Sequence, residues 1–361
     1  MPGAPTLEAE IDALFGRPPD EGVSLALVVQ QHGELVAERY GVRPPNLFEP
    51  DPNPITAETP LLSWSVAKSM VHAAVGILVG DGALDPADPA PVPEWQGTEK
   101  EAITLLDLLE MRSGLAFAED YLPARSAHGV GQGRPDQSSA LRSGTEGDLP
   151  RDEGEASDVI DMLFGSGSSD HAAYAAAKPL VHPVGAWWSY SSGTTNIICR
   201  IVGDVVAGGP GTSPEEREAA ARQFLDQRLF GPAGMPDADP RFDPAGNWVG
   251  SSYVHAPTRQ FARFGEVYLR DGVVGDTSVL PPGWADHART SIAHDPENGC
   301  DYGRHWWIWP DQPGSLAAHG YEGQYILVLP AHDAVVVHLG KTDASVRDRL
   351  VARLRRLVAT L

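Results

Sequence analysis

Lysine is scarce in this chain. Only four of its 27 basic residues are lysines, at Lys68, Lys100, Lys178 and Lys341, and the other 23 are arginines. The pKa of an arginine side chain stays above about 12, so arginine cannot act as a neutral base. An amine whose pKa can be lowered by its surroundings therefore has few possible positions in this sequence.

Cysteine and long apolar runs are also scarce. The two cysteines, Cys199 and Cys300, lie far apart without metal-ligand spacing, which argues against a disulfide framework and favours free thiols. No window is apolar over the length of a membrane span. Residues 1–15 contain neither a basic region nor an apolar core of signal-peptide length. We therefore expect a cytoplasmic protein.

Positive charge is in deficit as well. The formal net charge is −22 at pH 7 and the pI is near 4.8, which argues against nucleic acid and anionic membrane surfaces as partners. A length of 361 residues with 42% hydrophobic side chains fits an ordinary globular protein of one large domain or two interleaved ones. No cluster of His, Asp or Glu has metal-ligand spacing, so we expect no metal and no organic cofactor. We expect His171 and His182 at the surface or in loops.

The apolar patterns predict strands at both ends of the chain and helices in the middle. Alternating patterns predict one β-hairpin over residues 23–30 and 34–40 and another over residues 325–329 and 334–339. Helical periodicity and stop signals predict helices at 65–80, 104–111, 158–164, 171–180, 195–206, 214–229, 258–271 and 344–360. The terminal strands are therefore expected to share one sheet, with the helical middle as an inserted subdomain.

Two domains follow from this pattern. We predict that residues 1–64 and 251–361 form a discontinuous α/β domain and that residues 65–250 form a mainly helical domain. Residues 126–157 are rich in Gly, Ser, Asp, Glu and Arg and almost lack large apolar side chains. This composition predicts a mobile surface insertion, and a lid over a cleft is the alternative interpretation.

The stretch from Ser65 to Lys68, followed by a largely apolar run, is the strongest candidate for chemistry. Residues three apart lie on the same face of a helix, so the hydroxyl and the amine can meet without any long-range contact. Burial disfavours the charged form of lysine, and a neutral amine can take a proton from serine. Such a base requires a lysine pKa lowered from about 10.4 toward 7. A surface helix carrying both residues by chance is the alternative.

Two further clusters lie later in the chain. Tyr190 stands in a turn before a predicted buried helix, where its phenol could relay a proton, although a half-buried structural tyrosine is the alternative. His319, Gly320 and Tyr321 run directly into a predicted strand. Glycine at a strand edge permits close approach of a ligand, and a backbone N–H there could complete an oxyanion hole with the N–H of Ser65. An ordinary turn is the alternative for this cluster.

The three clusters in this order resemble the serine β-lactamase and penicillin-binding-protein superfamily. The likeness is closer to its class C branch, which includes 6-aminohexanoate-dimer hydrolases and family VIII carboxylesterases. Residues 103–114, 188–193 and 323–325 also resemble segments common in that branch. The resemblance spans roughly residues 20–360 and implies an α/β (α+β) fold of the β-lactamase/transpeptidase type. In that fold an antiparallel sheet of five or more strands, flanked by helices, lies beside an all-helical subdomain, with the active site between them.

Site roles follow from the resemblance by position. Ser65 would be the acylated nucleophile, Lys68 the base that activates it, and Tyr190 the group that assists proton transfer to the leaving group and the deacylating water. The backbone N–H groups of Ser65 and Tyr321 would form the oxyanion hole.

Substrate contacts are expected from His319 and Gly320, and Trp187 is a candidate for lining an apolar pocket. Two departures from the family pattern matter here. His319 begins the segment that replaces Lys-Thr-Gly, which removes a fixed cation that would bind the carboxylate of a β-lactam or a peptide terminus. Ser192 stands where the family has the Asn of Tyr-x-Asn. Both changes weaken the β-lactamase and peptidase interpretations.

The sequence therefore predicts a serine hydrolase that cleaves small esters or amides through an acyl-enzyme. The expected substrate is a small molecule, and carboxylesterase or 6-aminohexanoate-oligomer (nylon oligomer) amidase activity is favoured. A non-catalytic ligand-binding or sensor protein of the same fold is one alternative, since the fold alone does not establish activity. A β-lactamase or D-amino-acid peptidase is another. The choice between a monomer and a homodimer stays open.

Overall fold

The computed structural model describes residues 5–45, 51–119 and 157–361. The helices are α1 Leu7–Phe15, α2 Ala67–Gly80, α3 Leu105–Leu109, α4 Asp158–Phe164, α5 His171–Ala176, α6 Ser192–Ala207, α7 Pro214–Phe224, α8 Thr258–Leu269, α9 Trp284–Arg289 and α10 Arg347–Val358. The strands are β1 Val23–Gln31, β2 Glu34–Tyr40, β3 Val42–Arg43, β4 Asn53–Pro54, β5 Leu61–Leu62, β6 Asp239–Pro240, β7 Val254–Ala256, β8 Val273–Val274, β9 Thr277–Ser278, β10 Ala293–Asp295, β11 Cys300–Tyr302, β12 Trp307–Ile308, β13 Leu316–Gly320, β14 Gln324–Leu329 and β15 Ala334–Lys341. The predicted insertion at 126–157 lies, apart from Ser157, outside the described residues.

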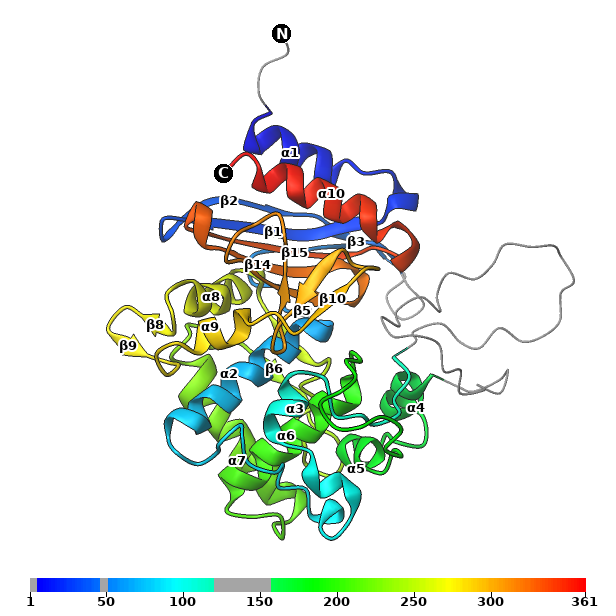
Figure 1. Cartoon of the computed structure of the whole chain (residues 1–361). Helices are drawn as coiled ribbons and strands as arrows, with labels where there is room; N and C mark the ends of the chain where they lie inside the picture. The colour runs from blue at the N-terminus through cyan, green and yellow to red at the C-terminus, as the bar shows by residue number, and fades with distance from the viewer. Residues whose placement is uncertain (1–4, 46–50, 120–156) are drawn as a thin grey trace, which may run out of the picture.

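One antiparallel sheet of eight strands joins the two ends of the chain. Its order is β10-β11-β12-β13-β14-β15-β1-β2, and β1 pairs with β15 so that Val23 lies opposite Lys341. Both predicted hairpins are present as neighbours in this sheet, which confirms that strands from both ends share it (Figure 1). The strands β10 to β13 were not predicted. They contain two to five residues each, too few for a clear alternating pattern.

Both faces of the sheet are covered by helices. Successive side chains of a strand point to opposite faces. In β1, Leu27 therefore packs into a cluster with Leu354 of α10, whereas Val28 packs into a second cluster with Phe261 of α8. Helices α1 and α10 lie side by side on one face, and α8 packs on the other (Figure 1). This double burial explains why β1 is apolar along most of its length.

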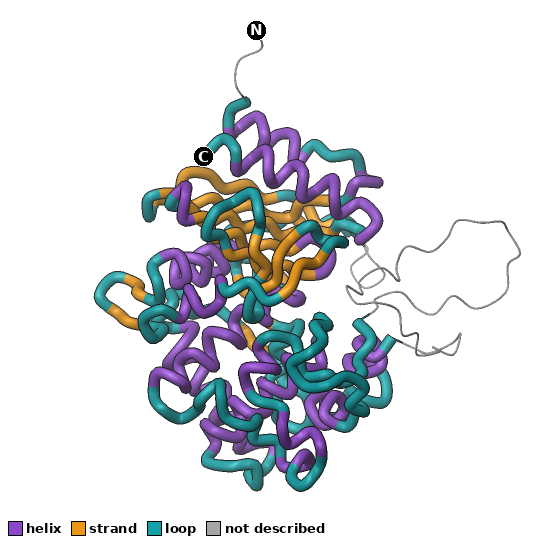
Figure 2. Tube along the Cα trace, viewed as in Figure 1, coloured by secondary structure: helices purple, strands orange, loops and turns teal. Residues whose placement is uncertain are grey.

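Helix α2 carries the predicted apolar run and is buried almost throughout, from Ala67 to Leu78. It ends at Gly80, where the stop signal was predicted. Its first turn differs from the prediction because Trp64–Val66 forms a 3-10 turn before the α-helix begins. Figure 2 shows the strands gathered in one part of the molecule and most of the helices in another. Every predicted helix is present among the described residues, whereas the short helices α1 and α9 were not predicted.

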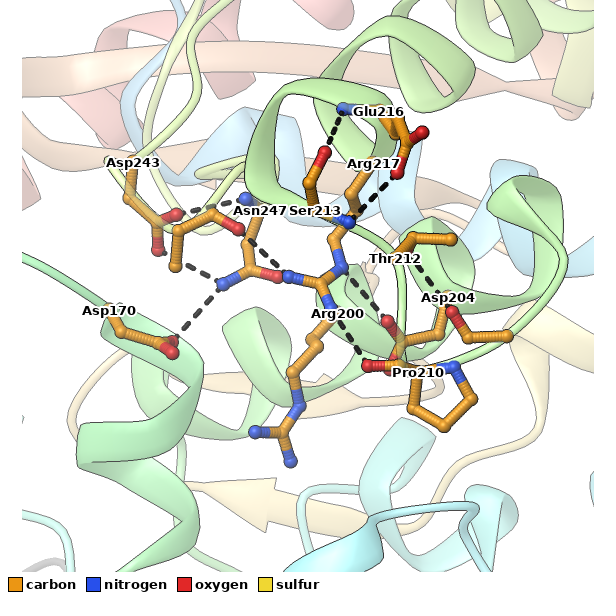
Figure 3. A network of polar contacts seen from close by, with 12 residues as sticks. Asp170, Arg200, Asp204, Pro210, Thr212, Ser213, Glu216, Arg217, Asp243 and Asn247 are labelled. Carbon is orange, nitrogen blue, oxygen red and sulfur yellow. Dashed lines mark hydrogen bonds and ion pairs between the residues drawn. The ribbon is translucent and has the colours of Figure 1, made fainter.

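Buried polar contacts hold the helical part together (Figure 3). Arg217 of α7 donates to Asp204 of α6 at 2.8 Å, and Asn247 bridges Asp170 at 3.1 Å and Asp243 at 3.3 Å. The expectation that His171 lies at the surface was wrong. Its side chain is buried, and its backbone N–H, at the start of α5, donates to the Asp243 carboxylate at 3.0 Å. These contacts join α6 to α7 and join the start of α5 to the segment that contains Asp243 and Asn247.

A small second sheet brings two distant segments to the same place. Its order is β5-β7-β6, so the strand that leads to Ser65 pairs with the strand that follows Ser251. None of the helices within residues 5–45, 51–119 and 157–361 combines the length and the apolar character needed to cross a membrane.

Candidate active site

Ser65 lies in the 3-10 turn between β5 and α2. The preceding residue, Trp64, has a φ of 44°, a left-handed conformation that is uncommon for a bulky side chain. The residue before it, Ser63, is fixed to β7 by two hydrogen bonds. Its N–H donates to the carbonyl of Val254 at 2.9 Å, and its Oγ accepts from the N–H of Val254 at 3.1 Å. This strained turn is therefore held in place by the small sheet.

The predicted pairing of Ser65 with Lys68 is present. The amine Nζ of Lys68 lies 2.9 Å from Ser65 Oγ, 2.8 Å from Ser192 Oγ and 2.9 Å from the carbonyl oxygen of Ser251. The Lys68 side chain is only 2% exposed. Ser65 and Lys68 come from one turn of chain, Ser192 from the start of α6, and Ser251 from the loop before β7. The amine is therefore surrounded by oxygen atoms from three segments.

The donors and acceptors around Lys68 can be assigned. Ser192 Oγ donates to the Glu119 carboxylate at 2.5 Å, because an ionised carboxylate can only accept. The lone pairs of Ser192 Oγ then face Lys68, and the Ser251 carbonyl oxygen has no hydrogen to donate. A neutral lysine amine has two hydrogens, and it donates them to these two oxygens. The remaining lone pair of Lys68 is left for the hydroxyl hydrogen of Ser65.

Burial tunes the amine for this role. It lowers the pKa of Lys68 to about 8, although the negative charge of Glu119 opposes the shift. At pH 7.5 an amine with that pKa is unprotonated in roughly a quarter of the molecules. Burial raises the pKa of Tyr190 well above its ordinary value, so a Tyr190 phenolate is scarce at this pH. Lys68 is therefore the better base of the two.

Tyr190 lies beside Ser65 and Lys68. The Lys68 Nζ is 4.9 Å from the centre of the Tyr190 ring. The Ser65 side chain partly offsets the rise in the pKa of Tyr190 that burial and the charge of Glu119 cause. Ser65, Lys68 and Tyr190 are thus brought together, as the sequence pattern predicts, with Tyr190 as a neutral phenol that can donate a proton.

The third cluster approaches the Ser65 turn from the main sheet. Gly320 ends β13 so close to this turn that an added Cβ would lie 2.6 Å from the carbonyl oxygen of Ser63. Tyr321 follows in a 3-10 turn and packs edge-on against Trp64, with ring centres 5.5 Å apart. Glycine at 320 is therefore required by space, and it sets the Tyr321 turn next to the nucleophile turn. The oxyanion role of the Ser65 and Tyr321 N–H groups stays a prediction.

His319 lies on the wall of the site as a neutral side chain. It stacks on Trp307 with ring centres 5.2 Å apart and accepts a hydrogen bond from Trp309 Nε1 at 3.0 Å. Burial and the charges of Arg347 and Arg355 hold its pKa well below its usual range. The fixed cation of Lys-Thr-Gly therefore has no counterpart at this position.

A narrow pocket connects these residues. It is lined by Ser65, Lys68, Ser69, Tyr190, Tyr302, His305, Trp307 and His319. Trp187 is not among them and stacks instead on His182, with ring centres 4.8 Å apart. The neighbouring Trp188 packs against Tyr302 and Trp307 behind the pocket. Substrate binding by Trp187 stays a prediction.

Sequence reasoning missed several contributors to the site, among them Ser192, Glu119 and Tyr302. Ser192 was noted only as a substitution for Asn, although a hydroxyl there can still contact the lysine. Glu119 and Tyr302 stand in no recognisable motif and reach the site through tertiary folding. Both Cys199 and Cys300 are buried free thiols. Within the described residues no group of three or more His, Cys, Asp or Glu side chains is placed to hold a metal ion.

Comparison with known proteins places this geometry in a family. The sequence profile of the Beta-lactamase family matches residues 11–360. The 6-aminohexanoate-dimer hydrolase of Paenarthrobacter ureafaciens is 27% identical over 352 residues, which cover 91% of this chain and 77% of that protein.

Solved structures share the fold at lower identity. A family VIII carboxylesterase superposes with a TM-score of 0.66 at 13% identity, covering 99% of this chain and 98% of the other. A penicillin-binding protein from Bacillus halodurans superposes with a TM-score of 0.63 at 15% identity, covering 97% and 99%. These structures establish the α/β fold of the β-lactamase and transpeptidase type. The profile match, which spans nearly the whole chain, shows that the chain belongs to the Beta-lactamase family and is a serine hydrolase.

Proposed function

We propose that this protein hydrolyses small esters or amides through an acyl-enzyme on Ser65, with 6-aminohexanoate oligomers and simple carboxylic esters as the favoured substrate classes. The observation that carries the proposal is the set of contacts around Lys68. Its Nζ lies 2.9 Å from Ser65 Oγ, and its other two partners, the Ser192 hydroxyl and the Ser251 carbonyl, both accept from it. This arrangement directs the lone pair of a neutral amine at the nucleophile.

Acylation begins with transfer of the Ser65 proton to Lys68. The Oγ atom then bonds to the substrate carbonyl carbon, and the developing oxyanion is stabilised by the N–H groups of Ser65 and Tyr321. The proton moves through Tyr190 to the leaving alcohol or amine as its bond to the carbonyl carbon breaks. In deacylation water gives up a proton and attacks the same carbon, and Ser65 Oγ regains a proton as it leaves. No net proton is gained or lost by the protein.

The surroundings of His319 support a substrate with an anionic group. On the other side of His319 lies a cavity of ≈ 290 Å³, whose lining includes His319, Arg347, Arg355 and Asp348. Arg355 pairs with Asp311 at 3.4 Å, and its buried Nε has no hydrogen-bond partner among the described residues. A 6-aminohexanoate leaving group ends in a carboxylate that these guanidinium groups could bind. This favours an amidase that acts on 6-aminohexanoate oligomers over an esterase that accepts only neutral substrates.

Hydrolysis of the linear 6-aminohexanoate dimer and of a series of p-nitrophenyl esters tests the substrate class. Arg347→Met should raise the KM for the dimer at least fivefold and leave the KM for neutral esters within twofold. Lys100→Met, which removes a distant cation, is the matched control. Equal effects of Arg347→Met on both substrates would contradict carboxylate binding in this cavity.

Two other outcomes would change the proposal. Ligand binding or a single acylation without turnover would favour a sensor protein of the same fold. Rapid hydrolysis of nitrocefin would favour a β-lactamase. The neutral His319 argues against the latter, because the cation expected to bind the β-lactam carboxylate is absent from that position.

A further inference from the structure

Tyr302 is a buried tyrosine whose hydroxyl has no hydrogen-bond partner among the described residues. The residue is only 1% exposed. Leaving a buried hydroxyl without a partner destabilises the folded protein. Such a group calls for a physical explanation, and one explanation is a ligand or water that binds it during function.

The surroundings of Tyr302 place this hydroxyl at the proposed reaction centre. The side chain lines the same narrow pocket as Ser65, Lys68 and Tyr190. Its ring lies edge-on to the Tyr190 ring, with centres 5.8 Å apart, and edge-on to Trp307 at 4.8 Å. The Tyr302 ring therefore lies beside Tyr190 in the wall of this pocket.

The position of Tyr302 is rigidly defined. It ends β11, pairs with Ala293 on one side and Trp307 on the other, and accepts from the N–H of Ile292 at 2.8 Å. The next residue, Gly303, has no room for a side chain, since an added Cβ would lie 2.0 Å from the carbonyl oxygen of Ala288. The hydroxyl is therefore presented by a fixed strand.

The protonation state of Tyr302 suits a positioning role. Burial raises its pKa well above the ordinary value, and the neighbouring Tyr190 and Glu119 raise it further. The phenol stays neutral and can donate one hydrogen bond and accept another. It is a poor candidate for the base, because Lys68 has a far lower pKa.

We propose that the Tyr302 hydroxyl positions the water molecule that hydrolyses the acyl-enzyme. A water held in a protein pocket needs two or more polar partners and room of its own. Tyr190 and Tyr302 line the same narrow pocket, which has no water-sized space in the resting protein, so the water must enter when the bound acyl group parts the pocket walls. The water oxygen bonds to the acyl carbon and its proton passes to Lys68, through Tyr190. A proton returns to Ser65 Oγ as the ester bond breaks. Tyr302 itself neither gains nor loses a proton.

This inference rests on the proposed acyl-enzyme, and Tyr302→Phe tests it with a p-nitrophenyl ester by rapid mixing. The burst, which reports acylation of Ser65, should keep its rate within twofold. The later steady phase, which reports deacylation, should slow by about tenfold, and the acylated protein should accumulate in mass spectra. The melting temperature should be unchanged or higher, because the lost hydroxyl has no partner in the resting protein.

Tyr268→Phe is the matched control. Its hydroxyl is also buried but is hydrogen-bonded with His72 Nδ1 at 2.7 Å. This control should lower the melting temperature and leave the ratio of acylation to deacylation unchanged. Deacylation of Tyr302→Phe at the wild-type rate would overturn the inference, as would an equal slowing of acylation and deacylation. Absence of any acyl-enzyme in the wild-type protein would instead overturn the proposed function, and this inference with it.

Discussion

The Glu119 carboxylate holds Ser192 by two hydrogen bonds, one from its backbone N–H at 2.7 Å and one from its hydroxyl at 2.5 Å. The first fixes the start of α6 and the second fixes the direction of the hydroxyl. Because the Ser192 hydrogen points to Glu119, its lone pairs point to Lys68. Glu119 thus orients the Ser192 hydroxyl that contacts Lys68, the proposed base.

Substitution of Glu119→Gln should therefore change both the rate and its pH dependence. An amide can donate as well as accept, so the direction of the Ser192 hydroxyl is no longer fixed, and we expect kcat to fall about tenfold. Glu119 also raises the pKa of Lys68, so the rising part of the pH–rate profile should move to lower pH. Steady-state kinetics between pH 5 and 10 measure both effects.

Glu94→Gln is the matched control for this prediction. Glu94 pairs with Arg200 at 2.7 Å in the helical part of the protein and makes no contact with Lys68. The Glu94→Gln variant should leave the midpoint of the pH–rate profile unchanged. A shift to higher pH in Glu119→Gln would contradict the assigned electrostatics.

The pH dependence of the wild-type protein should follow Lys68. Its folded-state pKa is lowered to about 8, and only the neutral amine accepts a proton. The kcat/KM for an ester should therefore rise with pH and level off above about 8. Of the other groups facing the amine, His305 has a lowered pKa of about 4, whereas burial raises the pKa values of Tyr190 and Cys199. None of these three titrates near pH 8.

Replacement of the base provides the complementary measurement. Lys68→Arg keeps a positive charge but supplies no neutral amine, so kcat should fall by about 10³-fold at every pH. Circular dichroism establishes that the variant is folded. A profile that still rises through pH 8 in Lys68→Arg would show that another group is the base.

Tyr190→Phe should affect poor leaving groups most. In the proposed mechanism the Tyr190 phenol supplies a proton to the departing atom, whereas a p-nitrophenolate leaves without one. We expect kcat/KM for an amide or alkyl ester to fall by 10²- to 10³-fold and that for a p-nitrophenyl ester to fall by less than about tenfold. Equal losses for both substrates would argue against proton donation by Tyr190 and for a packing role.

Gly320→Ala should displace the nucleophile turn. The added Cβ would lie 2.6 Å from the Ser63 carbonyl oxygen, so β13 or the turn must move. We expect a loss of about 1–3 kcal/mol in the free energy of unfolding and a fall in kcat. Gly211→Ala is the control, because an added Cβ there meets no atom within 4 Å. Denaturant unfolding and ester hydrolysis measure the two effects, and equal behaviour of the two variants would contradict the account.

The local parts of the site were predictable from the sequence. Ser65 and Lys68 are three residues apart, so helix geometry alone brings them together, and Tyr190 follows a recognisable pattern before a buried helix. Glu119 and Tyr302 were missed because tertiary contacts alone carry them to Lys68, across 51 and 234 positions of the chain. The terminal hairpins were predictable from alternation. The strands β10 to β13 are too short to show an alternating pattern. The sheet therefore contains more strands than the sequence pattern indicates.

Mass spectrometry of the intact protein after brief exposure to a p-nitrophenyl ester shows whether Ser65 becomes acylated. One acyl group should appear on the peptide that contains Ser65, form faster as the pH rises toward 8, and disappear as the acid product is released. Ser65→Ala should carry no such group. An acyl group that forms equally in Ser65→Ala, or no acylation of the wild-type protein by any ester or amide tested, would contradict the account.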